Sequence, residues 1–251
     1  MKLKDIYTQI AYGELRNVVL GTGAPKVTLG EEVPSENYNN LLPLVILGLT
    51  ELHKRFPLRE RTLTVELQTD QVSYALSYDF AESNNRSKEA VKYIKDASDN
   101  FQDDLMQVER IYGTYLEEEY EIPLNEIDND HSIRTSSFNI LQVPDDKEKA
   151  PWLKETSSLK VVYRADHPVF KDYVANSNPG NTTIYLPSTY MEALVWYIAS
   201  KATNPTGANG EFHEGNNYYG KFEAACALLT RQNFNVQSFN ENTKLHDRGF
   251  I

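Results

Sequence analysis

Hydrophobic periodicity changes twice along this chain of 251 residues, and that change limits the folds it can adopt. Near both ends, apolar residues recur at steps of three and four, the spacing that places them on one face of an α-helix. In the middle, apolar and polar residues alternate, as on a β-strand with one buried face. We therefore predict an α+β fold in which a β-rich region is inserted between helices from the two ends of the chain.

Two helices are predicted before the β-rich region. The first spans about residues 3–20. The second begins at Ser35 and carries apolar residues at helical spacing as far as Phe56. Pro43 and Gly48 fall inside it: Pro43 marks either a kink or a late helix start, and Gly48 allows another backbone to approach closely. Both helices have an apolar face that needs a partner.

Two further helices are predicted near the C-terminus. Thr189 and Glu192 have the spacing of a capping box, directly before the apolar run of one helix, and the other spans about residues 216–231. Their apolar stripes predict an αα-hairpin, which the N-terminal helices close into an antiparallel bundle. The side chains predicted to contact the bundle or a neighbouring subunit are Tyr190, Leu194, Trp196, Tyr197, Tyr218 and Phe222.

The middle of the chain contains several predicted strands. "RTLTVELQ" and "VSYALSYDF" alternate on either side of a polar turn and predict a hairpin. "LMQVERIYG", "SIRTSSFNILQVP" and "LKVVYRADHP" predict further strands. Residues 81–100 and the acidic segment 115–132 lack a core-forming pattern, so we predict surface loops there, with one short helix at residues 88–95.

These patterns divide the chain into four predicted regions. They are the N-terminal helices of the bundle at 1–60, the inserted β-rich domain with acidic loops at 61–183, the C-terminal helical hairpin at 184–232, and an extended tail at 233–251. Hydrophobic residues of the tail are separated by polar ones. The tail either docks on its own domain or supplies a strand to the sheet edge of a partner.

Composition and motifs argue against several classes of protein. A net charge of −11 disfavours proteins that wrap duplex nucleic acid, which need a basic surface. The chain lacks a P-loop, a dinucleotide fingerprint, a zinc-binding His pair at helical spacing and a nucleophile elbow. The five histidines are isolated and predicted to be surface or loop residues, and Cys226 is predicted to be a buried structural thiol. We expect no signal peptide, membrane span, catalytic residue, cofactor or metal.

The order of the elements resembles that of head-to-tail adaptor, or connector, proteins of short-tailed bacteriophages. In that family, Leu/Met-Pro is followed by a Tyr/Trp-rich helix ending in "KA" or similar, and then by a helix with a Tyr-x-x-x-aromatic-Glu-Ala pattern. The N-terminal segments "IAYGELRNV" and "LGLTELHKRFPLRERTLTVEL" are also similar to the openings of adaptor-like proteins. The matching positions here are Leu186-Pro187, Trp196-Tyr197-Ile198, Lys201-Ala202, Tyr218, Phe222, Glu223 and Ala224.

The resemblance implies a structural virion protein rather than an enzyme. It implies a ring of about twelve copies beneath the portal protein, with the tail nozzle below and a central channel through which DNA passes without specific binding. Such a protein resides in the neck of the virion, assembles in the host bacterial cytoplasm and has no membrane partner. The resemblance also implies that the tail grips the portal. The residues that would do so are Phe239, Leu245, Arg248, Phe250 and Ile251, with Arg248 pairing with a partner carboxylate.

Two other classes remain open. A binding module of a phage tail could use the sixteen tyrosines as a platform for a carbohydrate or a peptide. A hydrolase is the least favoured class, although carboxylates are numerous enough to form a glycosidase pair. The assembly protein should form oligomers or bind a portal ring, whereas the binding module should stay monomeric and retain a glycan.

Overall fold

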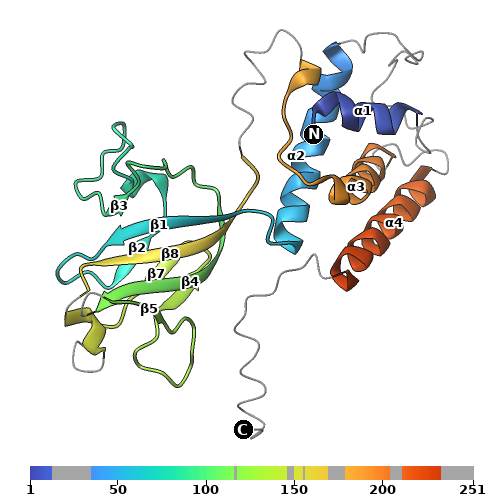
Figure 1. Ribbon diagram of the computed structural model, residues 1–251. Coiled ribbons are helices and arrows are strands. Elements are labelled where there is room, and N and C mark those ends of the chain that lie inside the picture. The colour runs from blue at the N-terminus through green and yellow to red at the C-terminus, as the bar shows by residue number, and fades with distance from the viewer. Residues whose placement is uncertain are drawn as a thin grey trace, which may run out of the picture. The chain divides into compact units, whose positions relative to one another are not determined.

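The computed structural model describes residues 1–12, 35–115, 118–145, 150–154, 156–168, 179–203 and 211–232. The chain forms two compact units (Figure 1). The helical unit comprises Met1–Pro57 and Pro168–Ile251, and the β unit comprises Leu58–His167. The described residues contain both α-helices and antiparallel sheets, so the predicted α+β class is confirmed.

The helical unit contains four α-helices within its described residues. They are α1 (Leu3–Tyr12), α2 (Ser35–Arg55), α3 (Met191–Thr203) and α4 (Glu211–Arg231). The start of α1 is held by the segment before α3. The Leu3 amide donates to the Thr182 carbonyl oxygen at 3.0 Å, and Lys2 forms an isolated antiparallel β-bridge with Thr183. Residues from both ends of the chain therefore build one core.

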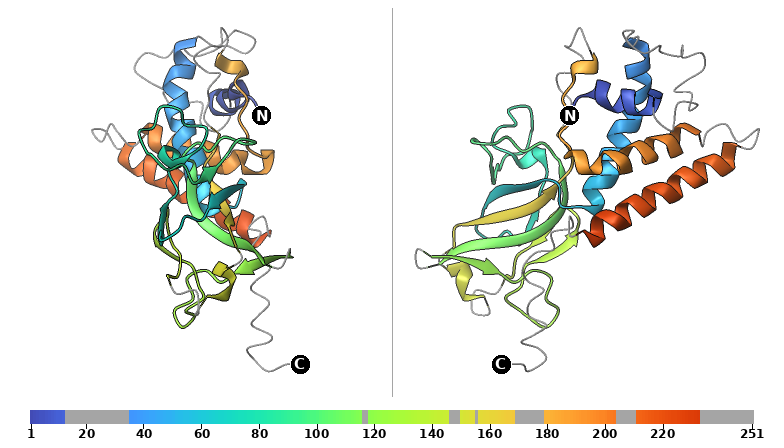
Figure 2. Two further views of the ribbon diagram at one scale, coloured as in Figure 1. Left: turned by 90° about the vertical axis from the view of Figure 1, so that its left-hand side faces the viewer. Right: turned by 45° about the vertical axis from the view of Figure 1, so that its right-hand side comes forward.

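The predicted antiparallel bundle is wrong. Among the described helices, only α3 and α4 run alongside each other, as the predicted hairpin required, whereas α2 crosses them at a steep angle (Figure 2). The crossing point explains this geometry. A Cβ atom added to Gly48 of α2 would lie 2.5 Å from Leu194 Cδ1 and 3.2 Å from Tyr197 Cδ1 of α3. The two helices thus approach closely at one glycine instead of packing along their length.

Two helix boundaries differ from expectation. Thr189 lies inside a 3-10 helix at Ser188–Tyr190 that leads into α3, so it does not cap the helix. Pro187 occupies the N-cap position with φ −60° and ψ 144° and makes no side-chain cap hydrogen bond. Helix α4 begins at Glu211, earlier than expected. Helix α2 begins at Ser35, as predicted, and continues through Pro43, so Pro43 does not mark a late helix start. Residues 13–20 of the predicted first helix lie outside the described residues.

The β unit contains two antiparallel sheets. The five-stranded sheet has the order β3-β1-β8-β4-β5, and the three-stranded sheet has the order β2-β7-β6 (Figure 1). The strands are β1 (Glu60–Glu66), β2 (Ser73–Ala75), β3 (Ile94–Lys95), β4 (Leu105–Tyr115), β5 (Glu118–Ile122), β6 (Arg134–Ser137), β7 (Ile140–Gln142) and β8 (Ser158–Ala165). One hydrophobic core includes residues from both sheets, among them Val65, Leu141 and Val161.

Several strand predictions are confirmed and others are wrong. Strands form where "LMQVERIYG", "SIRTSSFNILQVP" and "LKVVYRADHP" predicted them. However, β1 pairs with β3 and β8 while β2 pairs with β7, so the predicted β1–β2 hairpin does not form. Residues 88–95 contain no helix, and Tyr93 and Ile94 are buried in the core. The acidic segment 115–132 carries strand β5, whose Ile122 is also buried.

Side chains cap two strand edges of the three-stranded sheet. The Tyr93 hydroxyl accepts from the amide of Ala75 on β2 and donates to its carbonyl oxygen, both at 2.9 Å. On β6, the Thr135 amide donates to Asn125 Oδ1 at 2.8 Å. Asn125 has φ 58°, a left-handed conformation that Asn tolerates better than most residues. These backbone groups are therefore satisfied without another strand.

A charged cluster lies inside the β unit. Asp104 accepts hydrogen bonds from Arg59 Nη1 at 2.8 Å, Arg61 Nη1 at 3.0 Å and the Tyr163 hydroxyl at 3.0 Å. The side chains of Arg61 and Asp104 are only 7% and 4% exposed. The cluster joins the starts of β1 and β4 to the end of β8 in one network.

Candidate functional site

The predicted portal-docking residues Phe239, Leu245, Arg248, Phe250 and Ile251 lie outside the described residues. The predicted bundle or subunit contacts all lie on or beside α3 and α4. Tyr190, Leu194, Tyr197 and Phe222 are at most 8% exposed. Tyr190 packs edge-on against Phe56, and Tyr197 packs edge-on against Phe222, both with ring centroids 5.1 Å apart. Their contacts are with the core of their own unit.

Trp196 and Tyr218 lie at the surface, where they form an aromatic cluster with Lys221. Their rings stack at 5.8 Å with an angle of 16° between planes. Lys221 Nζ lies 4.2 Å from the centroid of the Trp196 ring, within the range of a cation–π contact. All three side chains are half-buried. Lys221 was absent from the predicted set, although its position three residues after Tyr218 places both on one side of a helix.

Four uncharged residues on one side of α4 are exposed to solvent, namely Gly220, Ala224, Ala227 and Leu228. We call these four positions the small-residue face; Arg231 lies on the same side of the helix and is also exposed. Leu228 is 51% exposed, and a Cβ atom added to Gly220 would meet no other atom within 4 Å. Small side chains at this spacing leave the backbone of α4 accessible to another helix.

An ion pair links α2 to α4 at the edge of the helical core. Arg55 donates from both terminal nitrogens to the two oxygens of Glu223, each at 2.7 Å, and from Nε to Glu51 at 3.0 Å. The Arg55 guanidinium also lies 4.6 Å above the centroid of the Phe222 ring. The hydrogen bonds from Arg55 hold the pKa of the Glu223 carboxyl below its usual range. This pair links the C-terminal end of α2 to α4.

Cys226 and His53 of this unit are both buried. Burial raises the pKa of the Cys226 thiol to about 11, so the thiol is protonated at neutral pH and a weak nucleophile. This agrees with the predicted structural role. The prediction for His53 is wrong, because its side chain is 1% exposed and its Nδ1 lies 2.8 Å from the Leu49 carbonyl oxygen, one turn earlier in α2.

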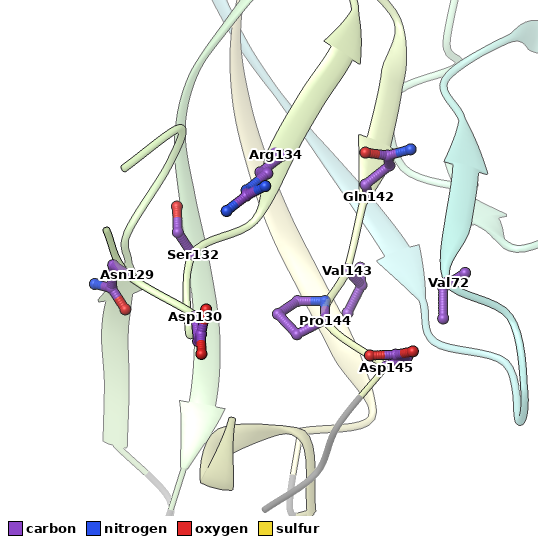
Figure 3. Close-up of a pocket in the computed structure, with 9 residues that line it drawn as sticks. All are labelled: Val72, Asn129, Asp130, Ser132, Arg134, Gln142, Val143, Pro144 and Asp145. Atoms are coloured by element: carbon purple, nitrogen blue, oxygen red, sulfur yellow. The ribbon is translucent and has the colours of Figure 1, made fainter. Parts of the chain in front are cut away.

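The β unit has a polar hollow of about 280 Å³ beside its three-stranded sheet. We call it the Arg134 hollow. Its apolar residues are Val72, Val143 and Pro144. In Figure 3, Val143 and Pro144 lie between Asn129, Asp130 and Ser132 on one side and Val72 and Asp145 on the other. The polar residues that line it are Asn129, Asp130, Ser132, Arg134, Gln142 and Asp145.

A second hollow of about 200 Å³ adjoins the first, and we call it the Asp70 hollow. The two share Val72, Val143, Pro144 and Asp145. The turn at residues 68–71 forms one wall of the second. That turn is held by the Tyr74 hydroxyl, which accepts from the Gln68 amide at 2.8 Å and donates to its carbonyl oxygen at 3.3 Å. The wall that this turn forms is therefore held in place by Tyr74.

The loop beside the Arg134 hollow is also fixed. Ser132 Oγ donates to the Pro123 carbonyl oxygen at 3.0 Å and accepts from the Glu126 amide at 3.0 Å. Trp152 Nε1 donates to the His131 carbonyl oxygen at 3.2 Å. The sequence predicts no role for these hollows, because their residues come from a loop, two strands and a turn that no short motif connects.

Across the described ranges, no group of three or more His, Cys, Asp or Glu side chains is placed to hold a metal ion. None of the helices in this part of the chain is both long and apolar enough to cross a membrane. A scan against models of known protein families finds no match, and a search of curated proteins finds none either.

Proposed function

We propose that this chain is a structural virion protein, a head-to-tail adaptor that forms a ring beneath the portal of a short-tailed bacteriophage. The order of its elements supports the proposal, since helices from both ends of the chain build one unit and the β unit is inserted between them. Of the residues that resemble the family, Trp196 lies on α3 and Tyr218 and Glu223 lie on α4, where they contact neighbouring side chains.

The observation that carries the proposal is the exposed small-residue face of α4, which ends at Arg231. A ring of identical subunits needs two different surfaces on each copy that fit each other. Gly220, Ala224, Ala227 and Leu228 offer one such surface on a 21-residue helix of a chain that is 24% charged. Removing Leu228 from water and packing backbone close to backbone both favour association with another helix.

The net charge of −11 agrees with the remaining parts of the proposal. A conduit for DNA should offer the phosphate backbone few cationic contacts, because each contact that releases counterions adds affinity and slows passage. The partners we propose are the portal protein, the tail nozzle protein and other copies of this chain. The proposed location is the neck of the virion, after assembly in the host cytoplasm.

The first test is quantitative peptide mass spectrometry on gradient-purified particles of the virus that encodes this chain. We expect about one copy of the chain for each portal subunit, as matched rings require. Absence of the chain from the particles would overturn the adaptor role.

A second test addresses the α4 face directly. Leu228→Glu places a charge on this face, and we expect it to abolish ring formation on purified portal, measured by native mass spectrometry, while helical circular dichroism is unchanged. The matched control is Val91→Glu in the β unit, since Val91 and Leu228 are 46% and 51% exposed. Equal ring formation by both variants would exclude the α4 face as the contact.

A further inference from the structure

We propose that the Arg134 and Asp70 hollows of the β unit together bind a neutral oligosaccharide. This would be a second activity, separate from the proposed ring. It rests on the chemistry of the side chains that line the hollows, the charges among them, the state of the adjacent strand edges and the continuity of the two hollows.

The lining offers hydrogen-bond donors and acceptors side by side. Asp130 and Asp145 carry carboxylates that only accept, Arg134 carries a guanidinium that only donates, and the Gln142 amide does both. A sugar hydroxyl is both a donor and an acceptor, so it can bridge a carboxylate and an amide or guanidinium. Arg134 makes one long hydrogen bond, 3.4 Å, to the Ile127 carbonyl oxygen, which leaves most of its five N–H groups for such contacts.

The charges disfavour an anionic ligand. Among the residues that line the two hollows, Asp70, Asp130 and Asp145 are anionic and Arg134 is cationic. A phosphate, a sulfated sugar or a sialic acid would meet more like charge than opposite charge. A ligand without charge avoids that repulsion and still satisfies the polar groups.

The neighbouring strand edges disfavour a peptide that binds as an added strand. Such peptides pair their backbone with free amide and carbonyl groups of an edge strand. The Tyr93 hydroxyl already satisfies Ala75 on β2, and Asn125 satisfies the Thr135 amide on β6. Side-chain recognition of hydroxyl groups therefore fits these surfaces better than strand addition.

The shape favours a chain of sugars over a single one. Volumes of about 280 and 200 Å³ fall below the roughly 300 Å³ at which most complete small-molecule pockets begin. Because the hollows share Val72, Pro144 and Asp145, consecutive units of one oligomer can occupy both. Pro144 and Val72 supply the apolar contact that the face of a sugar ring needs.

The test uses the full chain on an array of neutral oligosaccharides built from glucose, galactose, mannose and N-acetylglucosamine, printed beside sulfated and sialylated ones. The strongest neutral oligomer is then titrated by calorimetry, together with its own disaccharide. We expect the oligomer to bind and the disaccharide to bind more weakly. Gln142→Ala and Arg134→Ala should each weaken binding about three- to tenfold, the value of one or two hydrogen bonds.

Two exposed side chains elsewhere in the β unit provide matched controls. Gln107→Ala on β4 removes another exposed amide, and Arg86→Ala removes an exposed guanidinium from a loop. Both should leave binding unchanged. Failure of every neutral oligosaccharide to bind, a preference for the sulfated or sialylated probes, or equal affinity of Gln142→Ala and Gln107→Ala would each overturn the proposal. Copy number in the virus particle is independent of all these outcomes.

Discussion

The charged cluster around Asp104 in the β unit is buried, whereas the Arg55–Glu223 ion pair of the helical unit is partly exposed to solvent. In the β unit, the Asp104 carboxylate is 4% exposed and has three side-chain donors, Arg59, Arg61 and Tyr163. In the helical unit, Arg55 and Glu223 are 26% and 44% exposed and lie at the edge of an apolar core. The Asp104 cluster is part of the interior of the β unit, whereas the Arg55–Glu223 pair links α2 to α4 at the edge of the core.

This difference shows what each pair contributes. A buried charge has lost its hydration, so the fold depends on every partner that replaces water. A half-exposed pair keeps part of its hydration, and its removal costs little because water takes its place. We therefore expect the β unit to be far more sensitive to the loss of one carboxylate than the helical unit.

Asp104→Ala should have the largest effect. Removing this carboxylate leaves the 7%-exposed Arg61 guanidinium without its innermost partner, which should cost the β unit about 3–5 kcal/mol. The chain has two tryptophans, Trp152 in the β unit and Trp196 in the helical unit. Urea unfolding followed by Trp152 fluorescence in a Trp196→Phe background measures this loss. The control is Asp79→Ala, at an exposed residue. If Asp104→Ala lowers the free energy of unfolding no more than Asp79→Ala does, the β unit does not depend on its buried carboxylate.

Substitutions at two glycines test whether α2 and α3 approach closely at Gly48. Gly48→Ala forces a methyl group against Leu194 and Tyr197, and overpacking of about 1–3 kcal/mol should exceed the gain in helix propensity of about 1 kcal/mol. Gly220→Ala meets open space and should stabilise α4 by about 0.5–1 kcal/mol. The measurement is Trp196 fluorescence during urea unfolding in a Trp152→Phe background. Stabilisation by both substitutions would contradict the close crossing of α2 and α3.

The Arg55–Glu223 pair should have the smallest effect. A double-mutant cycle with Arg55→Met and Glu223→Gln should give a coupling energy of about 1 kcal/mol at pH 7 and low salt. The pKa of Glu223 is lowered in the folded state, so the coupling is fully present above the unfolded-state pKa of about 4.3. It should be lost as the pH falls through the lowered folded-state value. A coupling that grows on acidification would exclude this account.

Local patterns predicted the elements whose partners are also local. The stripes that include Tyr197 and Phe222 predicted the contact between α3 and α4, and alternation predicted β4 and β8. Cys226 was correctly placed on a buried face because Ala225 and Leu229 flank it on the same stripe.

Partners distant in sequence could not be predicted in this way. Strand β1 pairs with β8, almost a hundred residues later, while the adjacent β2 joins the other sheet. The polar run 81–100 is held by side chains such as Asp96, which accepts from the Ser83 and Phe101 amides, both at 2.9 Å. Burial alone would raise the pKa of Asp96, but hydrogen bonds from the Ser83 hydroxyl and from these two amides lower it below its usual value. A hydropathy pattern registers Asp96 as polar and therefore predicts a surface loop.

The predicted antiparallel bundle is wrong because it, too, depended on contacts between residues far apart in the sequence. Apolar stripes on α1 and α2 show that each needs a partner, but they do not set the angle of approach. That angle depends on Gly48 meeting Leu194 and Tyr197, a contact between residues far apart in the chain. The two hollows likewise bring the 129–132 loop beside the turn at residues 68–71 and the end of β7.

The Tyr93 hydroxyl that satisfies Ala75 also bears on solubility. An edge strand with free backbone groups can template the same strand of another molecule, and the risk grows with concentration. Here one phenol occupies that position on β2, and glutamates at 119 and 121 place like charges along β5. Both features disfavour pairing of these edges with the sheet of another molecule.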